Sequence, residues 1–145
     1  MKTFADTNCT ACHSGAALSG PALPAGQGFF MKFPALEDND YVAKYEFLKD
    51  QGRFDMTGKE SDRHLFKVPT LRNIALTAPY FHNGSVATLD EAVRVMAKTQ
   101  LNKDLSDQQV ADMVAFLNAL SGEFPQQTLP RLPATPGWAF AYDKK

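Results

Sequence analysis

The chain has 145 residues, of which 44 % are hydrophobic, and a formal net charge of −1 from 15 basic and 16 acidic side chains. This length is typical of one domain with a core of its own. The balanced charge argues against a nucleic-acid or membrane-surface binder, since both require a basic excess. No apolar run approaches the roughly 18 residues of a membrane span.

A short helical segment at residues 2–8 leads into the run Cys9-Thr10-Ala11-Cys12-His13. Two thiols at this spacing, followed directly by an imidazole, are typical of a c-type haem attachment site. Cys9 and Cys12 would bond covalently to the two vinyl groups on one edge of the ring. The turn after Cys12 would place His13 against the iron.

Other uses of Cys9 and Cys12 are less favoured. A zinc site would need two further soft ligands, and the chain has no third cysteine. A thioredoxin-like pair is expected in a βαβ pattern, and no strong strand surrounds this motif. A disulfide across two residues would close a very small loop and stabilise little.

The residues before the motif do not predict a secretory leader, yet covalent haem attachment normally takes place outside the cytoplasm. We therefore expect the sequence to be a mature fragment or one with an artificial Met1, with a further domain upstream.

An irregular loop rich in Gly, Pro, Ala and Ser is expected over residues 14–28. Such a loop can give a backbone carbonyl to the ring of His13, and Pro21 or Pro24 lies near enough to do so. The apolar residues at 29–33 are expected in the haem wall or the core.

The middle of the chain predicts short elements. A helix capped by the polar residues before it is expected over about 40–49, and a polar turn over 56–62. Residues 66–69 should be extended because a proline follows Val68. A short helix at 71–76 and an aromatic loop at 77–85 complete this part.

Two helices have clear starts. Thr88 and Ser106 each begin a capping box with an acid or amide three residues on. The first helix should run to about Ala97 and the second to about Leu120, with Gly122 after its end. The remaining residues are proline-rich. The pattern therefore predicts an all-α haem domain over 1–122 with long loops and an extended C-terminal tail over 123–145 packed on it.

The second axial position of the iron decides much of the chemistry. A methionine raises the reduction potential, a histidine leaves it lower, and an open site allows small molecules to bind. Met96 ends the apolar face of a capped helix far along the chain from His13, and we rank it first, against ordinary helix packing. The other candidates are Met31, Met56, Met113, His64 and His82. Of these, Met113 reads as a core residue and His64 as a surface residue.

Three motifs together resemble the C-terminal haem domain of the bacterial di-haem cytochrome c peroxidases. They are FKVPTLRNIALTAPYFHNG at 66–84, TLDEAVRVM at 88–96 and VAFLNALSG at 114–122. With the haem motif they keep the order of the family and span most of the chain. The resemblance implies a class-I cytochrome-c-like fold.

The resemblance also implies a division of labour between two haem domains. The N-terminal haem of the family reduces hydrogen peroxide to water. The C-terminal haem is ligated by histidine and methionine, here His13 and Met96, and passes on electrons from a small donor, a c-type cytochrome or a copper protein. The related methylamine-utilisation oxidases carry tyrosine at the methionine position. The chain alone should therefore be a poor peroxidase and no catalytic residue is expected in it.

Further features follow from the same resemblance. The family is periplasmic, is found as a homodimer and binds calcium at the domain boundary, partly through carbonyls that correspond to Thr77 and Pro79. From its own chemistry, Arg72 is a candidate either for a contact with a haem propionate, since a guanidinium matches a carboxylate, or for a surface salt bridge. The alternative function is a stand-alone monohaem electron carrier. A C-terminal haem domain separated from its N-terminal partner should instead show an apolar docking face, for which Tyr80 and Phe81 are the candidates.

Overall fold

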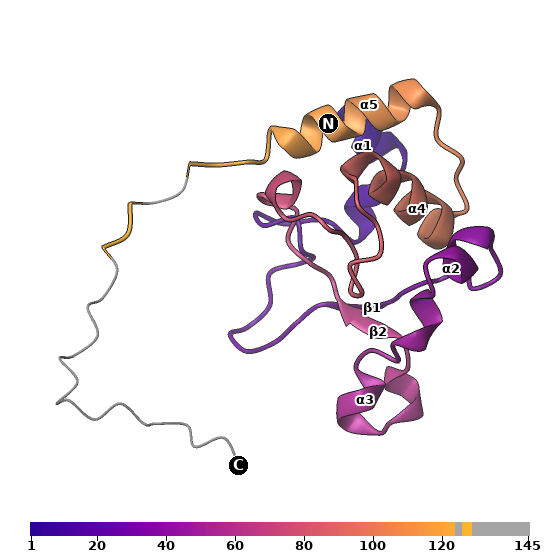
Figure 1. Ribbon diagram of the computed structural model, residues 1–145. Helices are drawn as coiled ribbons and strands as arrows, with labels where there is room; N and C mark the ends of the chain where they lie inside the picture. The colour runs from indigo at the N-terminus through magenta and orange to yellow at the C-terminus, as the bar shows by residue number, and fades with distance from the viewer. Residues whose placement is uncertain (124–125, 129–145) are drawn as a thin grey trace, which may run out of the picture.

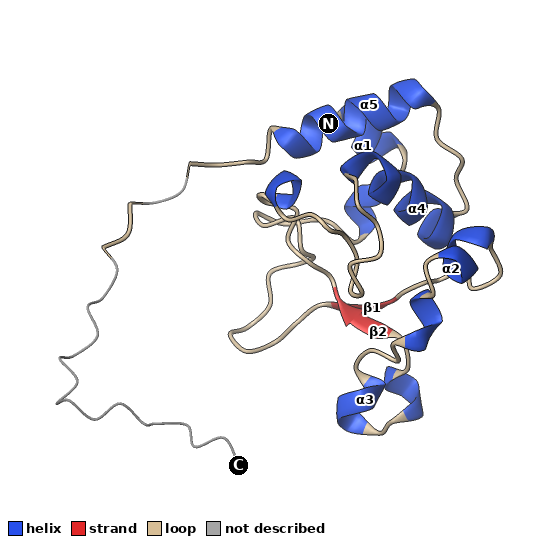
Figure 2. Ribbon diagram, in the orientation of Figure 1, coloured by secondary structure: helices blue, strands red, loops and turns tan. Residues whose placement is uncertain are grey.

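The structure is a computed structural model that describes residues 1–123 and 126–128. The tail expected over 123–145 lies almost entirely outside these residues. Helices and loops make up most of the described chain (Figures 1 and 2). The α-helices and strands are α1 (Lys2–Asp6), β1 (Phe30–Lys32), α2 (Asp40–Lys44), α3 (Phe54–Thr57), β2 (Leu65–Lys67), α4 (Leu89–Leu101) and α5 (Asp107–Asn118). The 3₁₀ turns are Cys9–Ala11, Phe47–Lys49, Glu60–Asp62 and Ile74–Leu76.

Helices α1, α4 and α5 gather at one end of the molecule (Figure 1). The rings of Phe4 in α1 and Phe116 in α5 lie 5.2 Å apart, and the Thr3 hydroxyl donates to Asp112 at 3.0 Å. Both bonds of the capping box expected at Ser106 are present at the start of α5. The N-terminal segment that carries the haem motif is therefore held against the helix nearest the C-terminal end of the described chain.

Strands β1 and β2 form a small antiparallel sheet in which Met31 pairs with Phe66. The extended backbone expected at 66–69 is thus confirmed for the part of that range within β2. The expectation of an all-α fold did not include this sheet. Each strand has only three residues, so the sheet is a small part of a fold that remains helical and rich in loops.

An aromatic core joins the sheet end to α4. Phe47 is fully buried, and its ring centroid lies 5.0 Å from that of Phe33 and 4.9 Å from that of Phe81. The buried members of this core are Phe33, Val42, Phe47, Tyr80, Val86 and Val95. Since Val95 belongs to α4, the core holds the helix that carries Met96.

Several expected boundaries were wrong. The helix expected over 40–49 ends at Lys44, because Glu46 adopts a left-handed backbone and the chain turns to bury Phe47. The helix expected over 71–76 is only the 3₁₀ turn Ile74–Leu76, preceded by a left-handed Asn73. The polar turn expected over 56–62 overlaps α3 and a 3₁₀ turn, where Arg63 lies 3.9 Å above the ring of Phe54.

The two capped helices differ from expectation at their ends. Helix α4 continues past Ala97 to Leu101, and α5 stops at Asn118. Gly122 does not cap α5. Its amide donates to the side-chain oxygen of Asn73 at 2.9 Å. In the described part of the chain, no helix combines the length and the apolar character needed to cross a membrane.

Candidate haem site

The haem motif lies on a tight turn. Cys9 begins the 3₁₀ turn Cys9–Ala11, directly after a left-handed Asn8, and the amide of His13 donates to the Cys9 carbonyl at 3.0 Å. Both cysteines are free and half-buried. Free thiols on one turn, closed by a histidine, are what covalent attachment to a haem edge requires.

The ring of His13 has one nitrogen in use. Its Nδ1 lies 3.0 Å from the carbonyl oxygen of Leu18, to which the neutral ring can donate. The hydrogen bonds among the described residues do not use Nε2. Burial lowers the pKa of His13, so the neutral ring is favoured. With Nδ1 as the donor, the lone pair of Nε2 is available to a metal.

The expected carbonyl was wrong. The sequence pointed to Pro21 or Pro24, but the acceptor is Leu18. Leu18 adopts a left-handed backbone (φ +52°) in a tight turn, in which its amide donates to the Gly15 carbonyl at 3.1 Å. The turn brings the Leu18 carbonyl to His13 several residues before either proline.

Gly20 closes this loop and could not be replaced without strain. Its backbone has φ +104°, and a Cβ at this position would lie 2.3 Å from a ring carbon of Phe29. The amide of Gly20 donates to the Ser14 carbonyl at 3.3 Å. The loop after the haem motif is therefore compact, although its composition suggested only irregular structure.

A residue far along the chain supports the Cys9 side of the motif. The ammonium of Lys103 donates to the carbonyl of Thr7 at 2.9 Å, and the Thr7 hydroxyl lies 3.3 Å from the Cys9 sulfur. Burial raises the pKa of the Cys9 thiol, against the opposing effects of Thr7 and Lys103. Sequence reasoning missed Lys103, since an isolated lysine after a helix carries no local signal.

Met96 is half-buried in α4 and packs against the aromatic core. The C-terminal part of its helix is tied to the sheet end by Gln100, whose side chain accepts from the Ala35 amide at 2.6 Å and donates to the Lys32 carbonyl at 2.9 Å. Neighbouring Thr99 is fully buried. Because these bonds hold the helix in place, the side chain of Met96 is well suited to serve as a fixed ligand.

The other methionines have different surroundings. Met113 is buried in α5 with 2 % exposure, which confirms its reading as a core residue. Met56 is 88 % exposed on α3. Met31 is 36 % exposed on β1.

The two remaining histidines are held within the protein by their neighbours. His64, expected at the surface, is in fact buried: its amide donates to the Gln51 carbonyl at 2.8 Å, and its Nδ1 lies 3.9 Å from the Glu37 carboxylate. Its local charges suggested exposure, but the backbone turn between α3 and β2 directs it inward. The ring of His82 stacks on Phe66 with centroids 4.3 Å apart.

Three further candidates lie at the surface. Arg72 is exposed, and its Nε donates to the Ala16 carbonyl at 3.0 Å in the loop after the haem motif. Thr77 is exposed and its hydroxyl donates to the Ile74 carbonyl at 3.0 Å, while Pro79 is exposed after a cis peptide bond. Within the described ranges, no group of three His, Cys, Asp or Glu side chains could hold a metal ion.

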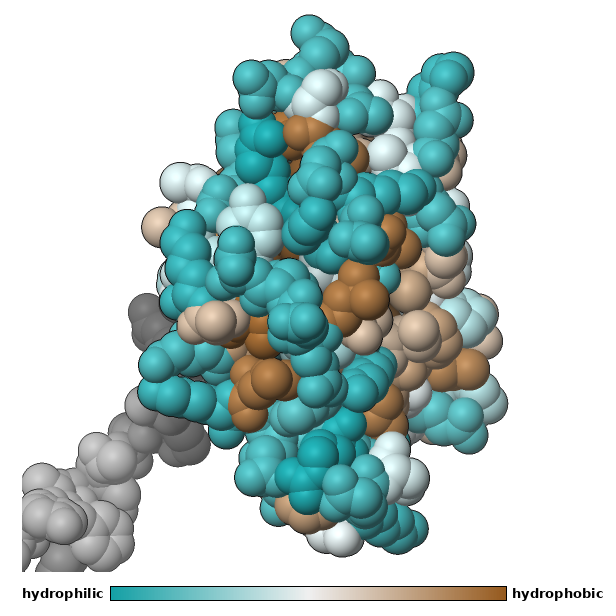
Figure 3. Space-filling view, turned by 90° about the vertical axis from the view of Figure 1, so that its right-hand side faces the viewer, coloured by the Kyte–Doolittle hydropathy of each residue, from teal (hydrophilic) through white to brown (hydrophobic). Residues whose placement is uncertain are grey.

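The two aromatic residues expected in a docking face, Tyr80 and Phe81, differ in exposure, and Phe81 is half-buried against the aromatic core. Tyr80 is 7 % exposed and belongs to the core. One face of the molecule carries hydrophobic residues in separate patches among hydrophilic ones (Figure 3). The large hydrophobic residues that are exposed are Met1, Leu23, Met31, Leu36, Leu48, Met56 and Leu76.

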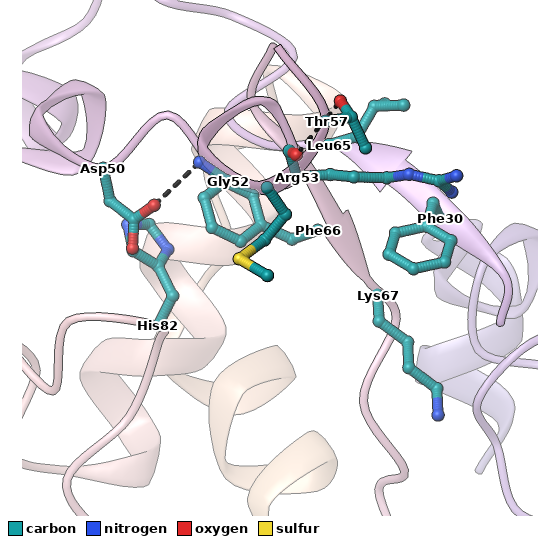
Figure 4. A pocket seen from close by; sticks show the side chains of 10 residues that line it. Phe30, Asp50, Gly52, Arg53, Thr57, Leu65, Phe66, Lys67 and His82 are labelled. Atoms are coloured by element: carbon teal, nitrogen blue, oxygen red, sulfur yellow. Dashed lines mark hydrogen bonds between the residues drawn. The ribbon is translucent and has the colours of Figure 1, made fainter. Parts of the chain in front are cut away.

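A hollow of about 540 Å³ lies elsewhere, beside the sheet (Figure 4). The guanidinium of Arg53 lies 4.7 Å from the ring centroid of Phe30, and the Asp50 carboxylate accepts from the Gly52 amide at 2.7 Å. His82 lines it as well. The proposed haem attachment residues Cys9 and Cys12 and the proposed iron ligands His13 and Met96 do not line this hollow.

The chain is similar to several known cytochrome c-like proteins. A family model described as RoxA-like, cytochrome c-like matches residues 66–100. The chain is 43 % identical over 130 residues to cytochrome c551 peroxidase of Nitrosomonas europaea, a match covering 90 % of this chain and 35 % of the relative. It is 42 % identical over 135 residues to cytochrome c551 peroxidase of Pseudomonas aeruginosa, covering 93 % of this chain and 36 % of that one.

A solved structure has a similar fold. It is described as a MauG-like protein associated with microbial copper homeostasis, and it is 29 % identical with a TM-score of 0.61. The match covers 84 % of this chain and 45 % of that one. The chain spans about a third of the length of the two cytochrome c551 peroxidases.

Proposed function

Since this chain is a cytochrome c-like domain that resembles the C-terminal haem domain of the bacterial di-haem cytochrome c peroxidases, we propose that it is the electron-input domain of such an enzyme. Residues 1–122 form the haem domain. It takes electrons from a small c-type cytochrome or copper protein in the periplasm. It passes them to a second haem in an N-terminal domain, where hydrogen peroxide is reduced to water.

One observation carries this proposal. His13 follows two free thiols, and its ring is fixed by the hydrogen bond between Nδ1 and the Leu18 carbonyl. Among the described residues, Nε2 of that ring has no hydrogen-bond partner. Cys9 and Cys12 would hold the haem covalently, and His13 and Met96 would ligate its iron. When bound in this way, the haem supplies reversible one-electron chemistry between Fe(III) and Fe(II).

The protein residues determine what that chemistry can do. As an iron ligand, the thioether of Met96 would leave no open coordination position for peroxide and would raise the reduction potential. Peroxide cleavage also needs a positioned acid or base, which we assign to the other domain. This chain therefore moves electrons and leaves the cleavage of the O–O bond to its partner.

The remaining expectations belong to the assembled enzyme. The proposed contact between Arg72 and a haem propionate is supported by the position of its guanidinium beside the loop that follows the haem motif. Calcium bound through the carbonyls of Thr77 and Pro79 would need further ligands from the N-terminal domain. A homodimer of the whole enzyme completes the proposal.

A stand-alone monohaem electron carrier is the second candidate. The burial of Tyr80 favours it, since this residue was expected to mark an apolar face left by a severed partner. Both candidates use the same four haem contacts and differ only in the partner.

Visible spectra and peroxide turnover of the haem-loaded chain test the proposal. We expect a low-spin c-type spectrum with a weak far-red sulfur-to-iron band, rapid reduction by a small cytochrome, and little peroxide turnover. Addition of the separately produced N-terminal haem domain should raise turnover if the chain is an input domain and leave it unchanged if it is a stand-alone carrier. Rapid turnover by the chain alone would contradict the assignment.

A further inference from the structure

We propose that Thr70 is a positioning residue for the haem, acting through the loop that holds His13. The inference rests on the proposed ligation of the iron by His13. Thr70 lies in the segment after β2, far along the chain from the haem motif, yet its hydroxyl donates to the Ala17 carbonyl at 2.7 Å. Ala17 directly precedes Leu18, whose carbonyl accepts the hydrogen bond from His13.

The contact belongs to a cluster of three bonds between two segments. Besides the Thr70 hydroxyl, the amide of Leu71 donates to the same Ala17 carbonyl at 3.3 Å, and Nε of Arg72 donates to the Ala16 carbonyl at 3.0 Å. Three consecutive residues therefore hold two consecutive carbonyls of the haem loop. This loop has no helix or strand of its own to fix it.

Thr70 is the central member of the cluster because its hydroxyl makes two bonds. It donates to Ala17 and also accepts from the amide of Arg72 at 3.1 Å. The second bond fixes the turn from which Leu71 and Arg72 reach the loop. Removal of one oxygen atom should thus loosen all three contacts, whereas changes to Arg72 affect only its own.

The consequence for His13 follows from the order of the two carbonyls along the backbone. The Ala17 carbonyl and the Leu18 carbonyl are adjacent along the backbone, so fixing the first restricts rotation of the second. A histidine ligand that donates through Nδ1 to a well-placed carbonyl is a stronger electron donor and keeps its ring orientation. Thr70 therefore acts on the electron density at His13 without touching the ring.

The decisive variants are Thr70→Val, which keeps the shape of the side chain and removes its hydroxyl, and Thr70→Ser, which keeps the hydroxyl. Thr70→Ala provides a second deletion without added bulk. The matched control is Thr57→Val. The Thr57 hydroxyl likewise donates to one carbonyl, that of Arg53 at 3.3 Å (Figure 4), and accepts from one amide, that of Lys59 at 3.3 Å, and neither partner belongs to the haem loop. All four are compared as haem-loaded proteins.

The main readout is solvent exchange of the Nδ1 proton of His13 in the reduced protein, followed by NMR, with the reduction potential as the second. In Thr70→Val and Thr70→Ala we expect exchange to be about fivefold faster, the effect of losing one ordinary hydrogen bond. The potential should rise because the imidazole donates less. Thr70→Ser should restore both values, and Thr57→Val should leave both unchanged.

Each contrary result is informative. Unchanged exchange and potential in both deletion variants, in a protein with the expected far-red band, would overturn the role of Thr70 and leave the proposed function intact. A failure of Thr70→Ser to restore the values would overturn the role of the hydroxyl. A spectrum without histidine and methionine ligation would instead defeat the proposed function.

Discussion

The phenolic hydroxyl of Tyr45 donates a 2.7 Å hydrogen bond to the carboxylate of Glu91 and joins two segments that lie 46 residues apart. The same carboxylate oxygen accepts from the ammonium of Lys44 at 3.2 Å, and that ammonium lies 4.6 Å from the Tyr45 ring. Glu91 was expected to complete a capping box with Thr88. The Thr88 hydroxyl does accept from the Glu91 amide, but the carboxylate binds the end of α2 instead.

Replacing Tyr45 by Phe should lower the free energy of unfolding by about 1 kcal/mol. The loss is that of a hydrogen bond to a charged group, reduced because the site is only half-buried. Urea unfolding measures it. Tyr41→Phe is the control, since the Tyr41 ring stacks on Tyr45 at 6.2 Å and its hydroxyl makes no hydrogen bond within the described residues. Equal losses in the two variants would show that the bond to Glu91 contributes nothing.

Glu91 should make stability depend on acid pH. The Tyr45 hydroxyl, assisted by Lys44, holds the pKa of Glu91 below its usual value near 4.5. The folded pKa lies below the unfolded one. The stabilisation is therefore complete above the unfolded value and is lost as the pH falls through the folded value.

Glu91→Gln should consequently lower the free energy of unfolding at pH 7 and should have a much smaller effect on it at pH 3. Unfolding in urea at the two pH values measures this difference. Asp90→Asn removes a charge from the same helical turn, where Asp90 makes no hydrogen bond among the described residues, and should not reproduce the pattern. A pH profile for Glu91→Gln parallel to that of the parent would refute the linkage.

Met96→Ala should abolish the far-red band and lower the reduction potential by on the order of 0.1 V, because axial methionine favours the reduced iron. Spectroelectrochemistry follows both quantities. Met31→Ala removes a methionine that is 36 % exposed on β1 and should change neither. If Met96→Ala kept both the band and the potential, another group would be the ligand.

Gly20→Ala should loosen the haem loop, since the added Cβ would lie 2.3 Å from the Phe29 ring and only 2.9 Å from its Cβ. We expect a loss of about 2 kcal/mol or more, from the clash together with the positive φ. Gly26→Ala is the control because Gly26 also has a positive φ (+82°) but nothing within 4 Å of the added atom. Denaturant unfolding of both proteins separates the clash from the backbone strain, and equal losses would exclude the clash.

Phe47→Ala should be the most damaging of these changes. The ring is fully buried among the aromatic residues that hold α4, and large-to-small changes at such sites cost about 3–5 kcal/mol. Loss of this support should also weaken the far-red band of Met96. Leu76→Ala removes a side chain that is 57 % exposed and should cost less than about 1 kcal/mol. A small loss for Phe47→Ala in urea unfolding would mean that the core is not the support of α4.

The part of the haem site that sequence alone determined is local. The spacing of Cys9, Cys12 and His13 sets the turn within a few residues, and Ser106 caps its helix through neighbouring backbone groups. Such patterns are readable because the interacting groups are close along the chain. The position of Met96 remains a prediction, supported by its place on a helix held against the core.

Tertiary structure alone decided which distant groups meet these local elements. Nothing near His13 in the sequence shows that Leu18 rather than a proline supplies its acceptor, or that Thr70 holds that loop. The burial of Tyr80 depends equally on residues far away. These contacts arise from the packing of many side chains at once, so no short stretch of sequence contains the information that fixes them.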